Sequence, residues 1–160
     1  MARLTISHEG LESLTFYRQY PELGATGSAL MSAVYSPDNP LPPRVKEAVR
    51  MRAALINECP VCRNARNFEI GVDERFYEHI AQFRDHPEIY SDRERVAMEY
   101  AERFALDHLS IDDALFGQLR AHFSERELAA LTISIGYFLA FGRLTQVLKL
   151  DQVCALPVAV

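Results

Sequence analysis

The sequence has few cysteines, and its charges are not gathered into blocks. Three cysteines in 160 residues are too few for the disulfide framework that stabilises many small secreted domains. The 17 lysines and arginines are interspersed with 22 acidic residues, for a formal net charge of −5. We therefore expect no basic patch that would bind nucleic acid or an anionic membrane.

Long apolar runs are also missing. Residues 1–9 lack a continuous apolar core, and no apolar stretch approaches the roughly 20 residues that span a bilayer. The chain is long enough for one domain with a sizeable core, and it contains neither an internal repeat nor a long linker. We expect a single cytoplasmic domain over residues 1–160, with its core between about residues 20 and 150.

Strand signals are nearly absent, whereas helix start signals recur along the chain. The segments 91–94 and 124–127 have the form of capping boxes, and the proline pair at 42–43 precedes an apolar-periodic run. These signals predict an all-α, compact helical bundle whose last helix lies at the centre or at a subunit interface. The predicted helices cover about residues 43–57, 59–70, 73–83, 91–105, 110–123 and 125–148, while glycines and prolines mark turns between 20 and 41.

Cys59 and Cys62 form a C-x-x-C motif, which can close a small disulfide and exchange electrons as a pair. The same spacing makes half of a zinc site, but zinc needs two further ligands at matching spacing, and none is evident. Cys154, the third cysteine, has no such partner and is expected to be an inert thiol. The motif therefore predicts a redox dithiol without metal or cofactor, and the alternative is a pair of ordinary, partly buried thiols.

The residues around the motif suggest how a thiol would be activated. A cysteine reacts as the thiolate, which a helix N-terminus and nearby cations favour by lowering the thiol pKa. Arg66 follows Cys62 by four residues, which places both on one face of the predicted helix 59–70. Glu47 precedes Cys59 by twelve residues, and a chain reversal between the two helices would bring it to the level of Arg66. We predict an ion pair between Glu47 and Arg66 behind the thiols.

The spacing of Glu47 from the C-x-x-C motif, on an all-helical chain, resembles the alkyl-hydroperoxidase D-like branch of the carboxymuconolactone decarboxylase superfamily. The segments 42–47, 91–97, 124–128 and 141–144 are also similar to this family, so that the resemblance covers roughly residues 20–150. It implies a compact helical fold, assembly into dimers, trimers or hexamers, and a thiol-dependent peroxidase activity. It also implies that Cys62 attacks the peroxide, that Cys59 resolves the product as a disulfide, and that an external thiol reduces that disulfide.

One position departs from the family pattern. Where the family has a histidine, this chain has Arg66, whose guanidinium stays protonated and does not act as a general base, although it can stabilise a thiolate. We therefore expect a catalytic set of Cys62, Cys59, Glu47 and Arg66, in which Glu47 orients Arg66 or accepts the proton through water. The predicted substrates are hydrogen peroxide or alkyl hydroperoxides, and the predicted partners are an external thiol reductant and further copies of the chain.

Two other functions compete with this prediction. A non-catalytic helical oligomer would use the dithiol as a redox sensor or not at all, and the missing histidine favours it. A lactone decarboxylase of the same superfamily needs no thiol pair, so the C-x-x-C motif argues against it. The aromatic residues Tyr137, Phe138 and Phe141 are expected in the core or in an interface, with the entry for an organic hydroperoxide as the alternative.

Overall fold

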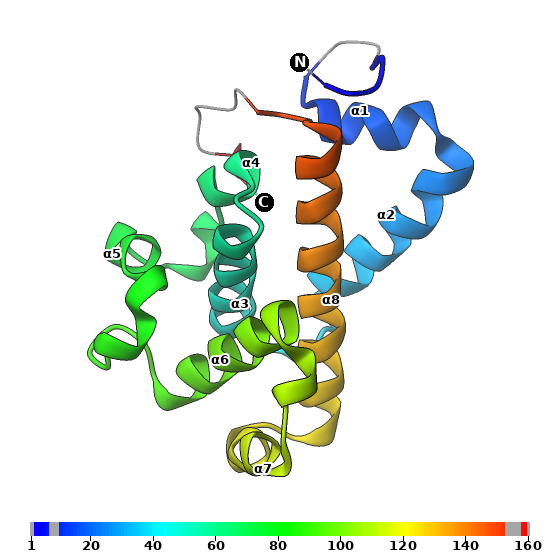
Figure 1. Cartoon of the computed structure of the whole chain (residues 1–160). Coiled ribbons are helices and arrows are strands. Elements are labelled where there is room, and N and C mark those ends of the chain that lie inside the picture. The colour runs from blue at the N-terminus through cyan, green and yellow to red at the C-terminus, as the bar shows by residue number, and fades with distance from the viewer. Residues whose placement is uncertain (1, 7–9, 153–157, 160) are drawn as a thin grey trace.

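Helices account for most of the chain in the computed structural model, which describes residues 2–6, 10–152 and 158–159 (Figure 1). Two short strands, β1 and β2, pair in parallel, with Ala65 opposite Val158. The elements in chain order are α1 (Glu12–Gln19), α2 (Pro21–Tyr35), α3 (Pro43–Ile56), α4 (Pro60–Asn64), β1 (Ala65–Arg66), η1 (Phe68–Ile70), α5 (Glu74–Glu78), η2 (Ile80–Asp85), α6 (Asp92–Leu106), η3 (His108–Ser110), α7 (Asp113–His122), α8 (Glu125–Leu148) and β2 (Val158–Ala159).

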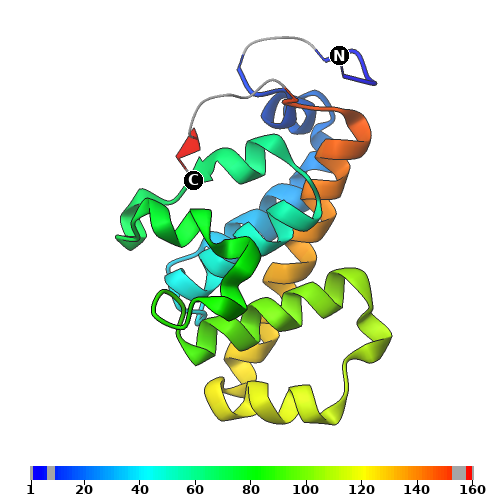
Figure 2. The ribbon, with the colours of Figure 1, turned by 60° about the vertical axis from the view of Figure 1, so that its left-hand side comes forward.

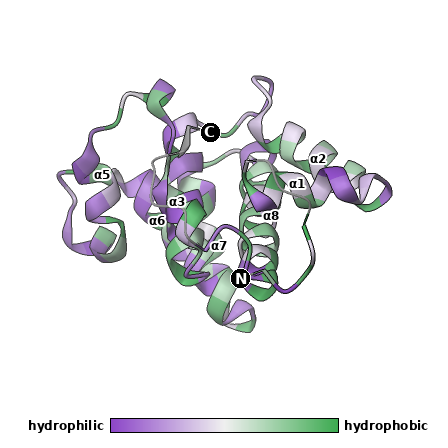
Figure 3. Cartoon of the chain, turned by 90° about the horizontal axis from the view of Figure 1, so that it is seen from above, coloured by the Kyte–Doolittle hydropathy of each residue, from purple (hydrophilic) through white to green (hydrophobic). Residues whose placement is uncertain are grey.

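The long helix α8 is the centre of the bundle. It contacts α3, α6 and α7, and also α2, which lies on the other side of it from α3 (Figures 1 and 2). Seen from above, α1 and α2 flank one side of α8, while α3 and α6 lie on the other (Figure 3). This arrangement confirms both the predicted all-α class and the central place of the last helix.

α8 is apolar for much of its length. Among the described residues, it is the one helix whose length and composition would allow it to cross a membrane, and 44% of its most apolar stretch is buried inside the fold. Its packing against four helices accounts for this composition. Ile133 and Val147 of α8 and Leu23 of α2 remain exposed. The predicted self-association stays a prediction, with these side chains as its candidate contacts.

The helix start signals in the sequence located several helices correctly. Ser91 and Ser124 each form a complete capping box, at the starts of α6 and α8, and α3 begins at Pro43 as expected. The prediction of turns between residues 20 and 41 was wrong at the two glycines, because α2 runs through Gly24 and Gly27. It was correct after Tyr35, where the helix ends and the chain turns at Pro37 and Asp38. A Cβ atom at Gly24 would lie 2.5 Å from the carbonyl oxygen of Tyr17, so this glycine permits close packing of α1 on α2.

The predicted helix 59–70 was also wrong beyond its first turn. α4 ends at Asn64, and the chain then runs extended through Ala65 and Arg66. The carbonyl groups of Cys62 and Ala65 accept hydrogen bonds from Arg50 of α3. A contact from a distant helix thus takes acceptors that a continuing helix would use for its own N–H groups. The expected helix 73–83 is similarly divided, into α5 and η2, and the helix predicted from Ser110 begins at Asp113.

We predict that Gly142→Ala lowers the free energy of unfolding by about 1–3 kcal/mol, because overpacking strains a tight contact. A Cβ atom at this position would lie 2.4 Å from Nδ2 of Asn57, which donates hydrogen bonds to the carbonyl groups of Phe138 and Leu139. Urea unfolding measures the change. Gly136→Ala on the same helix is the control, since a Cβ atom there meets nothing within 4 Å. It should stabilise the protein by up to about 1 kcal/mol, and an equal loss in both variants would contradict the packing argument.

Candidate functional site

The two cysteines of the C-x-x-C motif form a disulfide, with their Cα atoms 5.2 Å apart. The turn before them depends on Glu58, whose φ of 52° reverses the chain between α3 and α4. Cys59 is the N-cap of α4, and its Sγ accepts a hydrogen bond from the backbone N–H of Cys62. Cys59 is fully buried, whereas Cys62 is half-buried. The two sulfur atoms therefore differ in access, and Cys62 is the one that a reactant can approach.

A buried ion pair lies behind the disulfide. Glu47 and Arg50 are 2% and 5% exposed, and both carboxylate oxygens of Glu47 accept hydrogen bonds from the guanidinium, at 2.7 and 2.6 Å. Burial acts to lower the pKa of Arg50, but the hydrogen bonds and the charge of Glu47 outweigh it and raise the pKa. Arg50 therefore stays charged in the interior.

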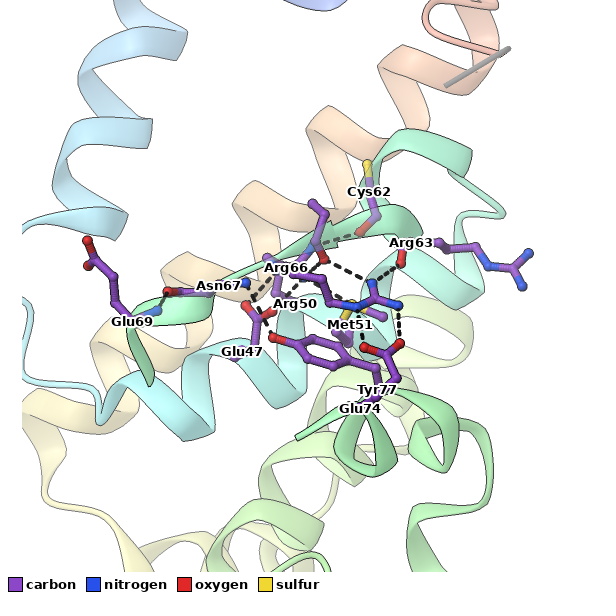
Figure 4. A network of polar contacts seen from close by, with 11 residues as sticks. Glu47, Arg50, Met51, Cys62, Arg63, Arg66, Asn67, Glu69, Glu74 and Tyr77 are labelled. Carbon is purple, nitrogen blue, oxygen red and sulfur yellow. Dashed lines mark hydrogen bonds and ion pairs between the residues drawn. The ribbon is translucent and has the colours of Figure 1, made fainter. Parts of the chain in front are cut away.

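Arg50 also holds the segment that carries the motif (Figure 4). Its Nη1 donates to the carbonyl oxygen of Cys62 at 2.7 Å, and its Nη2 donates to that of Ala65 at 2.9 Å. Arg50 was not among the predicted site residues. Its spacing from Glu47, three residues along one helix, was the signal that could have revealed the pair.

The predicted ion pair between Glu47 and Arg66 was wrong. Arg66 pairs instead with Glu74 at 2.7 Å, and its guanidinium stacks over the ring of Tyr77, 4.2 Å from the centroid. Figure 4 shows the guanidinium pointing away from the sulfur atom of Cys62. The physical reason is that α4 ends at Asn64, so that Arg66 is not on a helical face shared with Cys62.

The side chain of Tyr77 lies between the Glu47–Arg50 pair and the Arg66–Glu74 pair (Figure 4). Its ring supports Arg66, and its hydroxyl accepts a hydrogen bond from the backbone N–H of Asn67. Burial and the nearby Glu47 carboxylate raise the pKa of Tyr77 to about 12. The tyrosine is therefore neutral at physiological pH, and Glu47 keeps Arg50 as its charged partner.

A cavity of about 420 Å³ borders both Cys62 and Arg50. This volume is typical of small-molecule sites, and the walls are mainly apolar and aromatic. The wall residues come from α1, α2, α3, α4, β1 and α8, and they are Leu11, Ser13, Leu14, Tyr17, Arg18, Gly27, Ser28, Met31, Tyr35, Arg50, Ala54, Val61, Cys62, Ala65, Tyr137, Phe138, Phe141, Gly142 and Thr145. Tyr137, Phe138 and Phe141 thus border a pocket, while Phe138 also belongs to the hydrophobic core and Tyr137 packs against that core. The expected core position and the alternative, a pocket wall, both have support in the structure.

The aromatic wall is continuous and uncharged. The ring of Phe141 lies 5.6 Å from that of Tyr17 and 4.5 Å from that of Tyr137. Burial raises the pKa of Tyr17 and Tyr35 to about 12 and also raises the pKa of Tyr137, so these hydroxyls stay protonated. Among the described residues, no carboxylate lines this cavity, and the charged side chains of its wall are Arg18 and Arg50. Such a cavity favours an apolar, uncharged molecule.

In the described part of the chain, no group of three or more histidine, cysteine, aspartate or glutamate side chains is placed to hold an ion. Cys154, which the sequence analysis considered as a separate thiol, lies outside the described residues.

Comparisons with known proteins give relatives of undetermined function. No protein-family model matches the chain. The uncharacterized protein YnjA of Escherichia coli is 34% identical over 102 residues, which are 61% of this chain and 55% of that protein. The uncharacterized protein Rv2313c of Mycobacterium tuberculosis is 32% identical over 100 residues, 59% of this chain and 34% of that protein. The match therefore spans about half of the first relative and a third of the second.

Solved structures share the fold more completely. A protein of unknown function from Agrobacterium tumefaciens, whose name links it to the antioxidant defence protein AhpD, has a TM-score of 0.73 at 22% identity over 99% of both chains. An uncharacterized peroxidase-related protein from Silicibacter has a TM-score of 0.78 at 19% identity, over 91% of this chain and 80% of that one. An AhpD core protein from Ralstonia eutropha has a TM-score of 0.73 at 17% identity, over 87% of this chain and 75% of that one. The chain therefore has the AhpD-like helical fold, as the resemblance predicted.

We predict that Arg50→Gln lowers the free energy of unfolding by about 3–5 kcal/mol, because it leaves the buried carboxylate of Glu47 without its cationic partner. The double variant Glu47→Gln/Arg50→Gln contains no buried charge and should recover most of the loss. Urea unfolding of the wild type and both variants at one pH measures the difference. Equal destabilisation of the single and double variants would show that the charge pairing is not the source of the effect.

Proposed function

We propose that the protein is a thiol-dependent peroxidase that reduces hydrogen peroxide or organic hydroperoxides through the Cys59–Cys62 pair. One observation carries the proposal: Cys62, the more accessible sulfur, borders the apolar cavity, whereas its disulfide partner Cys59 is fully buried. A reactant in the cavity meets Cys62 first. The AhpD-like fold and the peroxidase-related neighbours support the same class of reaction.

The proposed cycle begins with the reduced dithiol. The thiolate of Cys62 attacks the terminal oxygen of R–O–O–H, the O–O bond breaks, and the product is a sulfenic acid on Cys62 with an alkoxide that takes up a proton to leave as R–OH. The thiol of Cys59 then attacks the sulfenic sulfur, releasing water and forming the disulfide that the structure contains. Two electrons pass to the peroxide, and an external dithiol restores both thiols.

The partners and the compartment are part of the proposal. The disulfide requires a thiol reductant that reaches Cys62, since Cys59 is buried. A reducing compartment keeps such a pair cycling, which favours the cytoplasm. Self-association through the exposed apolar residues of α2 and α8 is the proposed quaternary state.

The two alternative functions, a redox-sensing scaffold and a lactone decarboxylase, predict different behaviour of Cys59 and Cys62. A redox-sensing scaffold would form this disulfide, but its thiols would react with peroxide no faster than an ordinary cysteine. A lactone decarboxylase would keep its activity after loss of both thiols. The reaction rate of the reduced protein and the effect of cysteine substitution therefore separate the three functions.

We predict that hydrogen peroxide oxidises Cys62 of the folded, reduced protein at least about tenfold faster than it oxidises the same thiol in the urea-unfolded chain, because the folded site favours the thiolate. Peptide mapping should find the Cys59–Cys62 disulfide as the product. Cys62→Ser should abolish turnover with a dithiol donor, and Cys59→Ser should stop after one oxidation, with a sulfenic acid that dimedone traps. If Cys62→Ser spared the first oxidation and Cys59→Ser abolished it, the two roles would be reversed.

The cavity leads to a prediction about substrate size. Cumene hydroperoxide should oxidise Cys62 faster than hydrogen peroxide does, because its ring can occupy the aromatic wall. Ser28→Phe places a bulky side chain on that wall and should lower the ratio of the two rates about tenfold. Stopped-flow oxidation of the reduced protein measures both rates.

Ala29→Phe is the matched control for this substitution. Ala29 is the next residue of α2, and it is exposed and does not border the cavity. The control adds the same side chain to the same helix and should leave the rate ratio as in the wild type. Equal ratios in Ser28→Phe and Ala29→Phe would show that the cavity does not select the peroxide.

A further inference from the structure

We infer that Arg50 is the positioning residue for Cys62: it fixes the turn that carries the thiol and supplies the positive charge that stabilises the thiolate. The inference rests on the proposed function, because a stabilised thiolate matters only if Cys62 reacts. It goes beyond that function by assigning thiol activation to a residue outside the C-x-x-C segment, in place of Arg66.

The guanidinium of Arg50 fixes the geometry of the segment that carries Cys62. A guanidinium has five N–H donors in a rigid plane, so several acceptors around it are fixed relative to one another. Two of the acceptors are the carbonyl oxygens of Cys62 and Ala65, which end the single turn of α4. Arg50 thereby ties the backbone on both sides of Arg63 and Asn64 to helix α3. A lysine or glutamine does not make these contacts together with the two to Glu47.

Glu47 and Cys62 contact different edges of the Arg50 guanidinium. Glu47 occupies Nε and Nη2, whereas the carbonyl oxygen of Cys62 lies at Nη1 (Figure 4). The carboxylate is therefore on a different edge from Cys62, and the positive end of the pair faces the carbonyl group of Cys62. Glu47 keeps the arginine charged and oriented.

The Arg50 guanidinium also has one N–H group that takes no part in the contacts described above. Nη1 carries a second N–H, and none of the residues that the structure describes is recorded as its acceptor. Arg50 and Cys62 border the same cavity. We assign this N–H to the alkoxide oxygen that forms when the O–O bond breaks. Charge-assisted hydrogen bonds of this kind stabilise a developing anion. Figure 4 shows the sulfur atom of Cys62 directed away from the guanidinium and the carbonyl group directed toward it, so Arg50 acts on the thiolate through its charge.

The other charged and titratable groups around Cys62 do not offer the same contact. Arg18 of α1 and Arg63 of α4 are exposed, so that water screens their charges. Tyr35 of α2 and Tyr137 of α8 are neutral, as their raised pKa values require. Glu58 is exposed at the turn before the motif. Arg50 is the buried cation at this wall of the cavity.

The test measures thiol ionisation directly. The rate of iodoacetamide alkylation of Cys62 in the reduced protein is followed against pH, with peptide mapping to separate it from the other cysteines. In Glu47→Gln/Arg50→Gln, which should fold because no lone charge remains, the midpoint should rise by about one pH unit. The alkylation rate at pH 7 should fall to about a tenth. Arg50→Lys keeps the charge and should restore part of the shift.

The matched control is Arg52→Gln, on the same helix. Arg52 forms a similar, partly buried ion pair with Glu102, at 2.7 Å, but does not border the cavity. Arg52→Gln should lower the free energy of unfolding without moving the midpoint of the pH dependence of Cys62 alkylation. Arg66→Gln should likewise leave the midpoint unchanged, because that arginine is engaged by Glu74 and Tyr77.

Two outcomes would overturn the inference: an unchanged midpoint in the folded double variant, or an equal shift in Arg52→Gln. Failure of the proposed function would give a different experimental result. If the wild-type thiol has a low midpoint that depends on Arg50 but reacts with peroxides no faster than the unfolded chain, the peroxidase proposal fails and the assignment of Arg50 stands. Peroxide oxidation of the same samples therefore distinguishes the two failures.

Discussion

The buried ion pair of Glu47 and Arg50 is the constraint on which the rest of the site depends. Two charges in the interior are tolerated only when their hydrogen bonds are made, and Arg50 meets this need by bonding to Glu47 and to two backbone carbonyls of the cysteine segment. The pair therefore ends α4 after one turn and fixes Cys62 relative to α3. A change in either charge affects the fold and the thiol together.

The access to Cys62 has a separate origin, in helices that are far from the motif in sequence. α1 and α2 lie on one side of α8 and contribute Tyr17 and Ser28, while α8 contributes Tyr137 and Phe141. Small residues allow this approach, because a side chain at Gly27 would meet the ring of Phe141 at 3.1 Å. The segment that carries Cys62 is thus held by α3, whereas much of the cavity wall comes from α1, α2 and α8. The proposed thiol activation and the proposed choice of peroxide can therefore be changed by separate substitutions.

Local signals predicted the parts of the fold that local contacts determine. The starts of α3, α6 and α8 follow from prolines and capping boxes within one turn of each helix. Gly24 was interpreted as a turn signal because the approach of Tyr17 is a tertiary contact. The C-x-x-C motif indicated the cysteine pair, whereas the partner of Glu47 depended on where α4 ends. Arg50 sets that end from another helix, and no pattern within residues 59–70 contains this information.

The presence of Arg66 where the family that the sequence resembles has a histidine does not by itself exclude the proposed peroxidase chemistry. A histidine relay serves to take a proton from a thiol that is mostly protonated, but a thiol whose anion is stabilised by a fixed cation is already ionised to a useful extent near neutral pH. The proton then passes to solvent before the peroxide arrives, and the remaining need is to stabilise charge on the leaving oxygen. A buried guanidinium beside the cavity suits that need better than a general base. In the proposed mechanism, Arg66 occupies only the sequence position of the histidine, whereas stabilisation of the thiolate is assigned to Arg50.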